Sequence, residues 1–216
     1  MIQSMKRTRT SSTSSEPRAW VLQPSGKRLD LISPTPFDWE DSDLAVGLAR
    51  TFRWGGHSIW PLPLSVAQHS LFVLQLHRAS GKVRMGSELR ELLHDAEEGL
   101  VGFDPISPLK PILGQEFRNA MERLQRAVFL RYGVPAWTKS DHVAHKRIDI
   151  LAAASEAVHV AGWSVQDVKK VLKIRLMPLA IDPLIDIYGG NAWEPWPVEV
   201  ATERFLTELN GLLEQQ

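Results

Sequence analysis

The sequence SELRELLHDAEEGLVGFDPISPLK at residues 87–110 carries the pattern from which the fold and the site of this chain are predicted. Its apolar residues have the i, i+3, i+4, i+7 spacing of one buried helix face: Leu89, Leu92, Leu93 and Ala96. His94 and Asp95 lie near the end of this predicted helix and are followed by two glutamates. Buried charges are unfavourable unless they are paired or bound to a cation, so this helix end indicates a site.

A histidine lies on a second predicted helix upstream, within SVAQHSLFV at residues 65–73. Ser65 and Gln68 have the spacing of a capping box, so a helix is expected to begin there. His69 and Val73 then share one face, which directs His69 toward the interior. For His69 alone, a hydrogen-bonded core histidine is the more common explanation.

A carboxylate lies on a third predicted helix, HVAHKRIDILAAASEA at residues 142–157. Asp149 is surrounded by apolar residues and needs a partner, and a salt bridge with a neighbouring basic residue is the alternative to a site. His145 and Glu156 fall on the same helical stripe as Asp149, so they are expected to line the same cavity or its wall. A salt-bridged structural role for Glu156 is equally compatible with the sequence.

Together, His69, His94, Asp95 and Asp149 supply two imidazoles and two carboxylates from three predicted helices. Imidazole nitrogen and carboxylate oxygen suit a divalent transition metal ion, and Mn, Co, Fe and Zn all fit this set. A second metal ion would need further ligands, and no clear set is present. The sequence therefore predicts one divalent metal ion per chain.

Several segments resemble the HD-domain metal-dependent phosphohydrolases, in particular the bacterial and phage members related to 5′-deoxynucleotidases. The order H…HD…D is theirs, and HDAEEGLVGFDPISPLK at 94–110 is similar to their HDAxEayxGDxPxPLK segment. RWGGH at 53–57, SVAQHS at 65–70 and the opening SGKRLDLISPTPFDWEDSDLA at 25–45 also resemble family signatures. The chain has one extra residue between Gly102 and Asp104, which leaves the alignment of Asp104 open.

The resemblance implies a catalytic role for Glu98, because the family has a glutamate four residues after the histidine of its HD pair. On a continuing helix, Glu98 and His94 would share one face. Glu97 is interpreted as a solvated residue. Lys110 closes the SPLK element, where the resemblance favours a phosphate contact over a solvated charge.

The loop before the second helix contains the candidate substrate-binding residues Arg53, Trp54 and His57. A guanidinium group matches the geometry of a phosphate, and an indole ring can cover a sugar or a base. The alternative for Arg53 and Trp54 is that they only brace the loop. His57 either faces the metal site or forms hydrogen bonds within the loop.

Composition narrows the class of protein. The 216 residues have 44% hydrophobic content, 25 basic and 25 acidic side chains, and no cysteine. A net charge of zero argues against a general nucleic-acid binder, and the absence of cysteine excludes a disulfide framework. No apolar run reaches the length of a membrane span and no signal peptide is evident, so a cytoplasmic location is expected.

The predicted fold is all-α: one HD-domain helical bundle over residues 18–216 with a small N-terminal β-hairpin, preceded by a disordered tail at 1–17. Pro24-Ser25-Gly26 marks the hairpin turn. Helices are expected at 41–52, around 117–132, at 140–160, from Ser164 to about Leu176, and after Pro197.

Three functions from different classes are compatible with these motifs. The first is a phosphohydrolase acting on nucleotides, with deoxynucleoside 5′-monophosphates favoured and a deoxynucleoside triphosphate triphosphohydrolase as its variant. The second is a non-catalytic nucleotide sensor, against which the intact ligand set and Glu98 argue. The third, a two-iron oxygenase of the same fold, would need additional histidine ligands. A homo-oligomer is left open.

Overall fold

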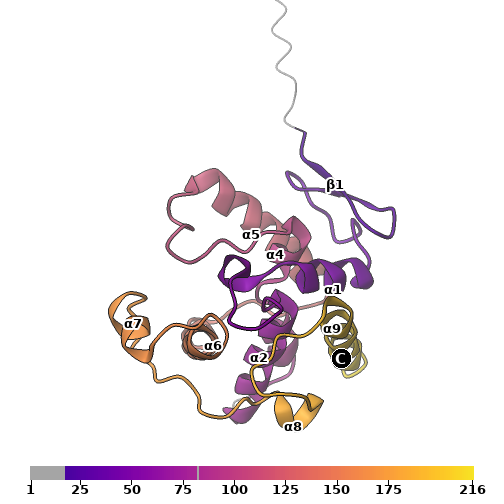
Figure 1. The fold of residues 1–216 in the computed structure, drawn as a ribbon. Coiled ribbons are helices and arrows are strands. Elements are labelled where there is room, and N and C mark those ends of the chain that lie inside the picture. The colour runs from indigo at the N-terminus through magenta and orange to yellow at the C-terminus, as the bar shows by residue number, and fades with distance from the viewer. Residues whose placement is uncertain (1–17, 82) are drawn as a thin grey trace, which may run out of the picture.

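The computed structural model describes residues 18–81 and 83–216. The tail predicted at residues 1–17 lies outside the described residues. Within them, the chain is mostly helical, with one two-stranded antiparallel sheet near its N-terminal end (Figure 1). The prediction of an all-α fold with a small N-terminal hairpin is confirmed.

The hairpin consists of β1, Trp20–Leu22, and β2, Arg28–Asp30, with Val21 opposite Leu29. Its turn is fixed to the next element by a carboxylate. Asp43 accepts the backbone N–H of Ser25 at 2.9 Å and the Ser25 hydroxyl at 2.5 Å. The hairpin is therefore attached to the helical body.

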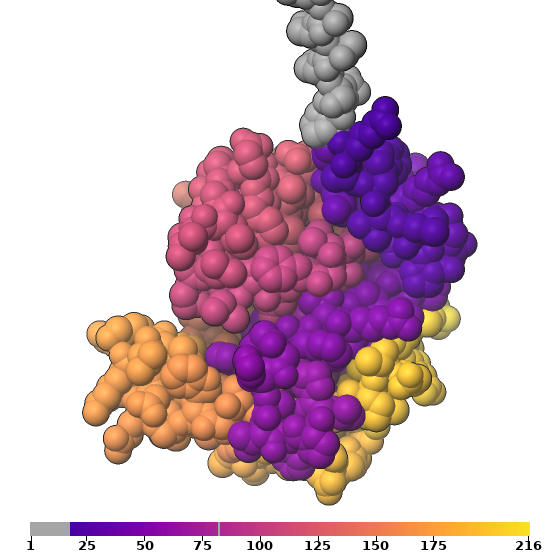
Figure 2. Space-filling view, turned by 45° about the horizontal axis from the view of Figure 1, so that its top comes forward, coloured from indigo at the N-terminus to yellow at the C-terminus, as the bar shows by residue number. Residues whose placement is uncertain are grey.

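The helices follow in the order Asp41–Arg50 (α1), Val66–Ala79 (α2), Ser87–Leu92 (α3), Ala96–Val101 (α4), Gly114–Arg131 (α5), Lys139–His159 (α6), Val165–Lys170 (α7), Ile185–Tyr188 (α8) and Val198–Leu213 (α9). A short 3-10 helix, η1, spans Arg53–Gly56 between α1 and α2. The segment around α7 projects from the body as a lobe (Figure 2).

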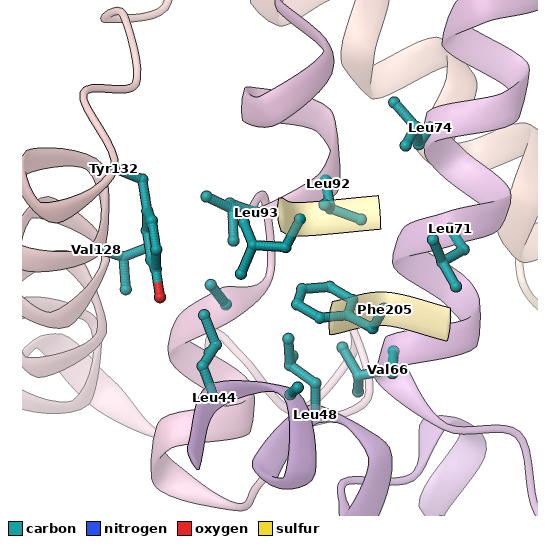
Figure 3. Packing of buried hydrophobic residues seen from close by; sticks show 14 of the residues in the cluster. Leu44, Leu48, Val66, Leu71, Leu74, Leu92, Leu93, Val128, Tyr132 and Phe205 are labelled. Carbon is teal, nitrogen blue, oxygen red and sulfur yellow. The ribbon is translucent and has the colours of Figure 1, made fainter. Parts of the chain in front are cut away.

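The core lies between helices that are distant in sequence. α1 packs against α4 and α9, and α2 packs against α3 and α6. Figure 3 shows apolar side chains from five elements converging on one cluster, which includes Leu44, Leu48, Val66, Leu71, Leu92, Val128 and Phe205. Each is fully or almost fully buried. This burial is the main stabilising contribution to the fold.

Two glycines set the distance between α1 and α4. A Cβ atom on Gly47 would lie 2.4 Å from the carbonyl oxygen of Gly99, and a Cβ on Gly99 would lie 2.7 Å from the backbone nitrogen of Leu48. Both distances are shorter than van der Waals contact. The two backbones therefore touch at a point that only glycine permits, one residue after Glu98.

Some predicted boundaries were wrong. The helix expected to continue through His94 is interrupted after Leu92 and resumes at Ala96. The helix expected to reach Leu176 ends at Lys170. Of the described helices, none is both long and apolar enough to cross a membrane.

Candidate metal centre

His69 lies in the first turn of α2 and is fully buried. The helix begins as predicted, because the Ser65 hydroxyl accepts the backbone N–H of Gln68 at 3.1 Å. The Gln68 side chain does not complete the capping box, since its amide bonds the backbone at Glu194 and Trp196. Ser65 thus fixes the start of α2, and this start places His69 on the inner face.

His94 and Asp95 lie in the turn between α3 and α4. Asp95 has φ −116° and ψ 26°, outside helical geometry. The turn is also supported from α5, because the Gln125 amide donates to the carbonyl oxygens of Leu93 at 3.0 Å and His94 at 2.8 Å; the Leu93 oxygen accepts the Ala96 backbone N–H as well. The turn allows two consecutive side chains to reach one centre.

The four predicted metal ligands come together. The Nε2 atoms of His69 and His94 are 3.2 Å apart, and Asp95 Oδ2 lies 3.1 Å from His94 Nε2 and 3.6 Å from His69 Nε2. These three residues form a cluster that could hold a metal ion. Asp149 Oδ1 lies 3.7 Å from His69 Nε2, while its Oδ2 accepts from Lys146 at 2.7 Å. Asp149 therefore has both the site contact and the salt bridge considered for it.

The protonation of the two imidazoles follows from their outer nitrogens. His69 Nδ1 lies 2.5 Å from Glu156 Oε1, and His94 Nδ1 lies 2.7 Å from the carbonyl oxygen of Glu91. Both partners are acceptors, so each Nδ1 carries the hydrogen and each Nε2 of a neutral ring carries a lone pair. Two Nε2 atoms 3.2 Å apart beside a carboxylate can share a proton or bind a cation together. The residues present fit a divalent metal ion.

Charge at the centre acts on the pKa values of its members. Burial lowers the pKa of His94, but the charge and hydrogen bond of Asp95, together with the Asp149 charge and the Glu91 carbonyl group, raise it to about 10. Burial raises the pKa of Asp95, but the His94 charge and hydrogen bond together with the His69 and Arg53 charges hold this pKa well below the ordinary value. Burial also raises the pKa of Asp149, but the His69, His94 and Lys146 charges together lower it to about 2.

Arg53 and Trp54 lie in η1, beside the centre and joined to one carboxylate. Glu156 Oε2 accepts from Arg53 Nε at 3.3 Å and from Trp54 Nε1 at 3.2 Å. Arg53 Nη1 also lies 3.3 Å from Asp104 and 3.9 Å from Asp95. Asp104 and Glu156, whose roles the sequence left open, therefore both lie at the site as partners of Arg53.

The prediction for Glu97 was wrong. Its side chain is partly buried, and one of its carboxyl oxygens is buried with no hydrogen-bond partner in the part of the chain that the structure describes. Burial together with the Asp95 charge raises its pKa to about 8. The helix interruption changes the register, so α4 turns Glu97 inward as well. Sequence periodicity had assumed one continuous helix.

Glu98 is almost fully buried and accepts from Lys110 Nζ at 2.9 Å. Its second oxygen has no hydrogen-bond partner among the described residues, and burial raises its pKa well above the ordinary value. Lys110 remains half exposed. Glu98 and Lys110 are thus a pair with one free carboxyl oxygen.

His57 is exposed, and its backbone N–H donates to the Trp54 carbonyl oxygen at 3.2 Å. This supports the loop alternative for His57. His145 lies behind the centre: its ring is 4.9 Å from that of His94, and its Nδ1 is 2.6 Å from Glu91 Oε2. Glu91, which was not predicted, therefore contacts three histidines through different atoms, because its Oε1 also lies 3.8 Å from His77 Nδ1.

Comparison with known proteins gives one similar chain. Over 156 residues the sequence is 40% identical to an uncharacterized protein of Rhodobacter capsulatus, and the match covers 71% of this chain and 79% of that protein. No protein-family model matches the chain.

Proposed function

We propose that the chain, which belongs to the same family as this uncharacterized Rhodobacter capsulatus protein, is a metal-dependent phosphohydrolase acting on nucleotides. The observation that carries the proposal is the pair of imidazole Nε2 atoms at 3.2 Å beside Asp95. The H…HD…D motifs of the sequence add the expectation of an HD-domain enzyme.

His69, His94, Asp95 and Asp149 would hold the metal ion. When bound, such an ion supplies a Lewis acid that polarises a phosphoryl oxygen and lowers the pKa of water. The ligands come from α2, α6 and the turn between α3 and α4. Several separately anchored elements hold the donor atoms in place.

Glu98 is the candidate for proton transfer. A buried carboxyl group with a raised pKa keeps its proton closer to neutral pH than an exposed one, so it can donate that proton to a leaving oxygen. Its free oxygen is the atom available for this transfer. Lys110, paired with the other oxygen, supplies a positive charge that favours a phosphate beside it.

Arg53 and Trp54 are the candidates for substrate recognition. The guanidinium group is held by Glu156 and Asp104, so it is oriented before a ligand arrives. Preorganisation of this kind lowers the cost of binding a phosphate. The Trp54 indole is held through its Nε1 and packs beside Ala154, Ala157 and Val168, and the part of the ring that stays exposed can contact a sugar or a base.

A deoxynucleoside 5′-monophosphate is the favoured substrate, as the sequence resemblance implies. The test is a panel of ribo- and deoxyribonucleoside mono- and triphosphates with Mn²⁺, Co²⁺, Fe²⁺ and Zn²⁺, read by released phosphate, pyrophosphate and triphosphate. We expect phosphate release from monophosphates. Triphosphate release would instead identify a triphosphohydrolase, and binding without turnover would identify a sensor.

The matched control is the double variant His94→Ala, Asp95→Ala, which should lose both bound metal and turnover while its helical circular dichroism persists. Full metal content in this variant, measured by elemental analysis, would refute the assigned centre.

A further inference from the structure

One buried carboxylate joins the metal centre to the loop that carries Arg53 and Trp54. Glu156 is 1% exposed. Its Oε1 faces His69 Nδ1 at 2.5 Å, and its Oε2 accepts from Trp54 Nε1 and Arg53 Nε at 3.2 and 3.3 Å. All three partners are donors, and they come from α2 and η1, whereas Glu156 itself belongs to α6.

The position of Glu156 on α6 explains why it reaches both groups. It lies seven residues, or about two helical turns, after Asp149, so the two carboxylates project from one face. Asp149 presents its Oδ1 to the inner nitrogen of His69, and Glu156 meets the outer nitrogen of the same ring. A single imidazole is thus held between two carboxylates of one helix.

The loop is held in an uncommon backbone conformation. Trp54 has φ 57° and ψ 25°, the left-handed region that non-glycine residues seldom occupy, so surrounding contacts must hold it there. Those contacts are the bond from Nε1 to Glu156 and the packing of the ring beside Ala154, Ala157 and Val168. The Glu156 carboxylate is the polar part of this restraint.

A cation bound at His69 Nε2 changes the hydrogen bond between His69 Nδ1 and the Glu156 carboxylate. An imidazole that donates its lone pair to a metal ion becomes a stronger hydrogen-bond donor at its other nitrogen, and a carboxylate partner in turn makes the ring a better ligand. The carboxylate shares its charge between this ring and the two donors of η1. Its bonds to Arg53 and Trp54 therefore respond to whether His69 carries a cation.

We propose that Glu156 is a positioning residue that couples cation binding at His69 to the orientation of Arg53 and Trp54. The proposal rests on the proposed function, because it assumes that the centre binds a divalent cation. Coupling of this kind is reciprocal: a ligand that reorients Arg53 or Trp54 changes the affinity of the centre for the cation by the same factor. Metal and substrate sites then act as one unit.

The experiment titrates the whole protein with Zn²⁺ alone and follows tryptophan fluorescence. The chain has eight tryptophans, so the contribution of Trp54 is the difference between the parent protein and Trp54→Phe. We expect Zn²⁺ to change this difference signal in the parent. In Glu156→Gln, Zn²⁺ should bind roughly 10- to 100-fold more weakly and the Trp54 signal should not respond at saturation.

Two further variants isolate the role of Glu156. Asp43→Asn removes another buried carboxylate, one that serves the hairpin turn, and should leave Zn²⁺ affinity and the Trp54 response unchanged. Glu156→Asp keeps the charge but is shorter by one methylene, so it should not reach His69 and Trp54 together. Glu156→Asp should lose the Trp54 fluorescence response with a smaller loss of Zn²⁺ affinity. This variant therefore tests the proposal even if Glu156→Gln does not fold.

The outcomes separate the two proposals. A parent protein that binds no divalent cation would overturn both the metal centre and the coupling. A parent that binds Zn²⁺ while Glu156→Gln and Glu156→Asp retain its affinity and the Trp54 response would overturn only the role of Glu156. Weaker Zn²⁺ binding in Glu156→Gln, with loss of the Trp54 response at Zn²⁺ saturation in both variants, supports the coupling.

Discussion

At His69 and His94, the hydrogen-bond acceptor beside Nδ1 determines which ring nitrogen carries the hydrogen. Glu91 offers a carbonyl oxygen to His94, and Glu156 offers a carboxylate to His69. Only the carboxylate carries a charge, so the two imidazoles differ in basicity although both present Nε2 to the same point. Sequence motifs predicted that these two histidines lie at one site, but their outer partners depend on contacts that are distant in sequence.

Glu98→Ala should reduce turnover by about 10² to 10⁴, the usual range for a lost general acid or base. It should leave the metal bound, because Glu98 pairs with Lys110 and not with a metal ligand. Steady-state rates and metal content measured on the same preparation check both parts.

Glu97→Ala is the comparison for this prediction, because Glu97 is the neighbouring partly buried carboxyl on the same helix. A large loss of turnover in Glu97→Ala with none in Glu98→Ala would show that Glu97, and not Glu98, carries out the proton transfer.

The lowered pKa of Glu156 predicts that the free energy of unfolding of the metal-free protein depends on pH. Burial raises its pKa, but the His69 and Arg53 charges outweigh burial and lower it to about 2, from an ordinary value of 4.5. A lowered acid pKa in the folded state stabilises the fold above the unfolded pKa, and this contribution is lost as pH falls through the folded value. The free energy of unfolding of the parent should therefore exceed that of Glu156→Gln by a smaller amount as the pH falls from 4.5 to 2.

Denaturant unfolding of both proteins in the presence of a chelator, repeated across this pH range, measures the difference between their free energies of unfolding. A difference between the two proteins that stays constant with pH would contradict the shift assigned to Glu156.

At the scale of elements, the interruption between α3 and α4 is the feature that the sequence predicted least well. Apolar spacing through Ala96 indicated one continuous helix, although Asp95 and Glu98 also have the Asp-x-x-Glu spacing of a helix start, and Asp95 is the N-cap of α4. The turn is supported from α5, where the Gln125 amide donates to the carbonyl oxygens of Leu93 and His94. By contrast, the first turn of α2 follows from Ser65 alone and was predicted correctly.

Gln125→Ala should destabilise the fold by about 1 to 3 kcal/mol, because it removes the side-chain donor that the Leu93 and His94 carbonyl groups share, although Leu93 keeps the Ala96 N–H. It should also weaken metal binding, since these carbonyls belong to the turn that carries the ligands. Denaturant unfolding and Zn²⁺ titration test the two effects. Gln115→Ala, an exposed position on the same helix, is the control and should change neither.

At the scale of the molecule, the regular helices were the most predictable part. The apolar stripes of α1, α5 and α9 follow from their 3.6-residue period, and the buried residues Leu44, Leu124 and Phe205 fall on them. The segment from 177 to 197 could not be assigned in detail, because its structure depends on tertiary contacts such as the stacking of Trp193 on His159. Periodicity carries no information about such contacts.

The metal ion should stabilise the whole molecule, because its ligands join α2, α6 and the α3–α4 turn. At a free concentration one hundred times the dissociation constant, the expected gain is about 2.7 kcal/mol. Thermal unfolding with Zn²⁺ and with a chelator measures it. The double variant His94→Ala, Asp95→Ala should show no difference between the two conditions, and an equal gain in that variant would place the ion elsewhere.

The contact between Gly47 and Gly99 has an evolutionary consequence. Each glycine leaves room for the backbone of the other helix, so selection acts on the two positions together although they are 52 residues apart in the chain. A side chain at either one would push α4 away from α1 and displace Glu98 with it. In descendants of this sequence, the pair should therefore persist together as long as the site is used, and relax together once it is not.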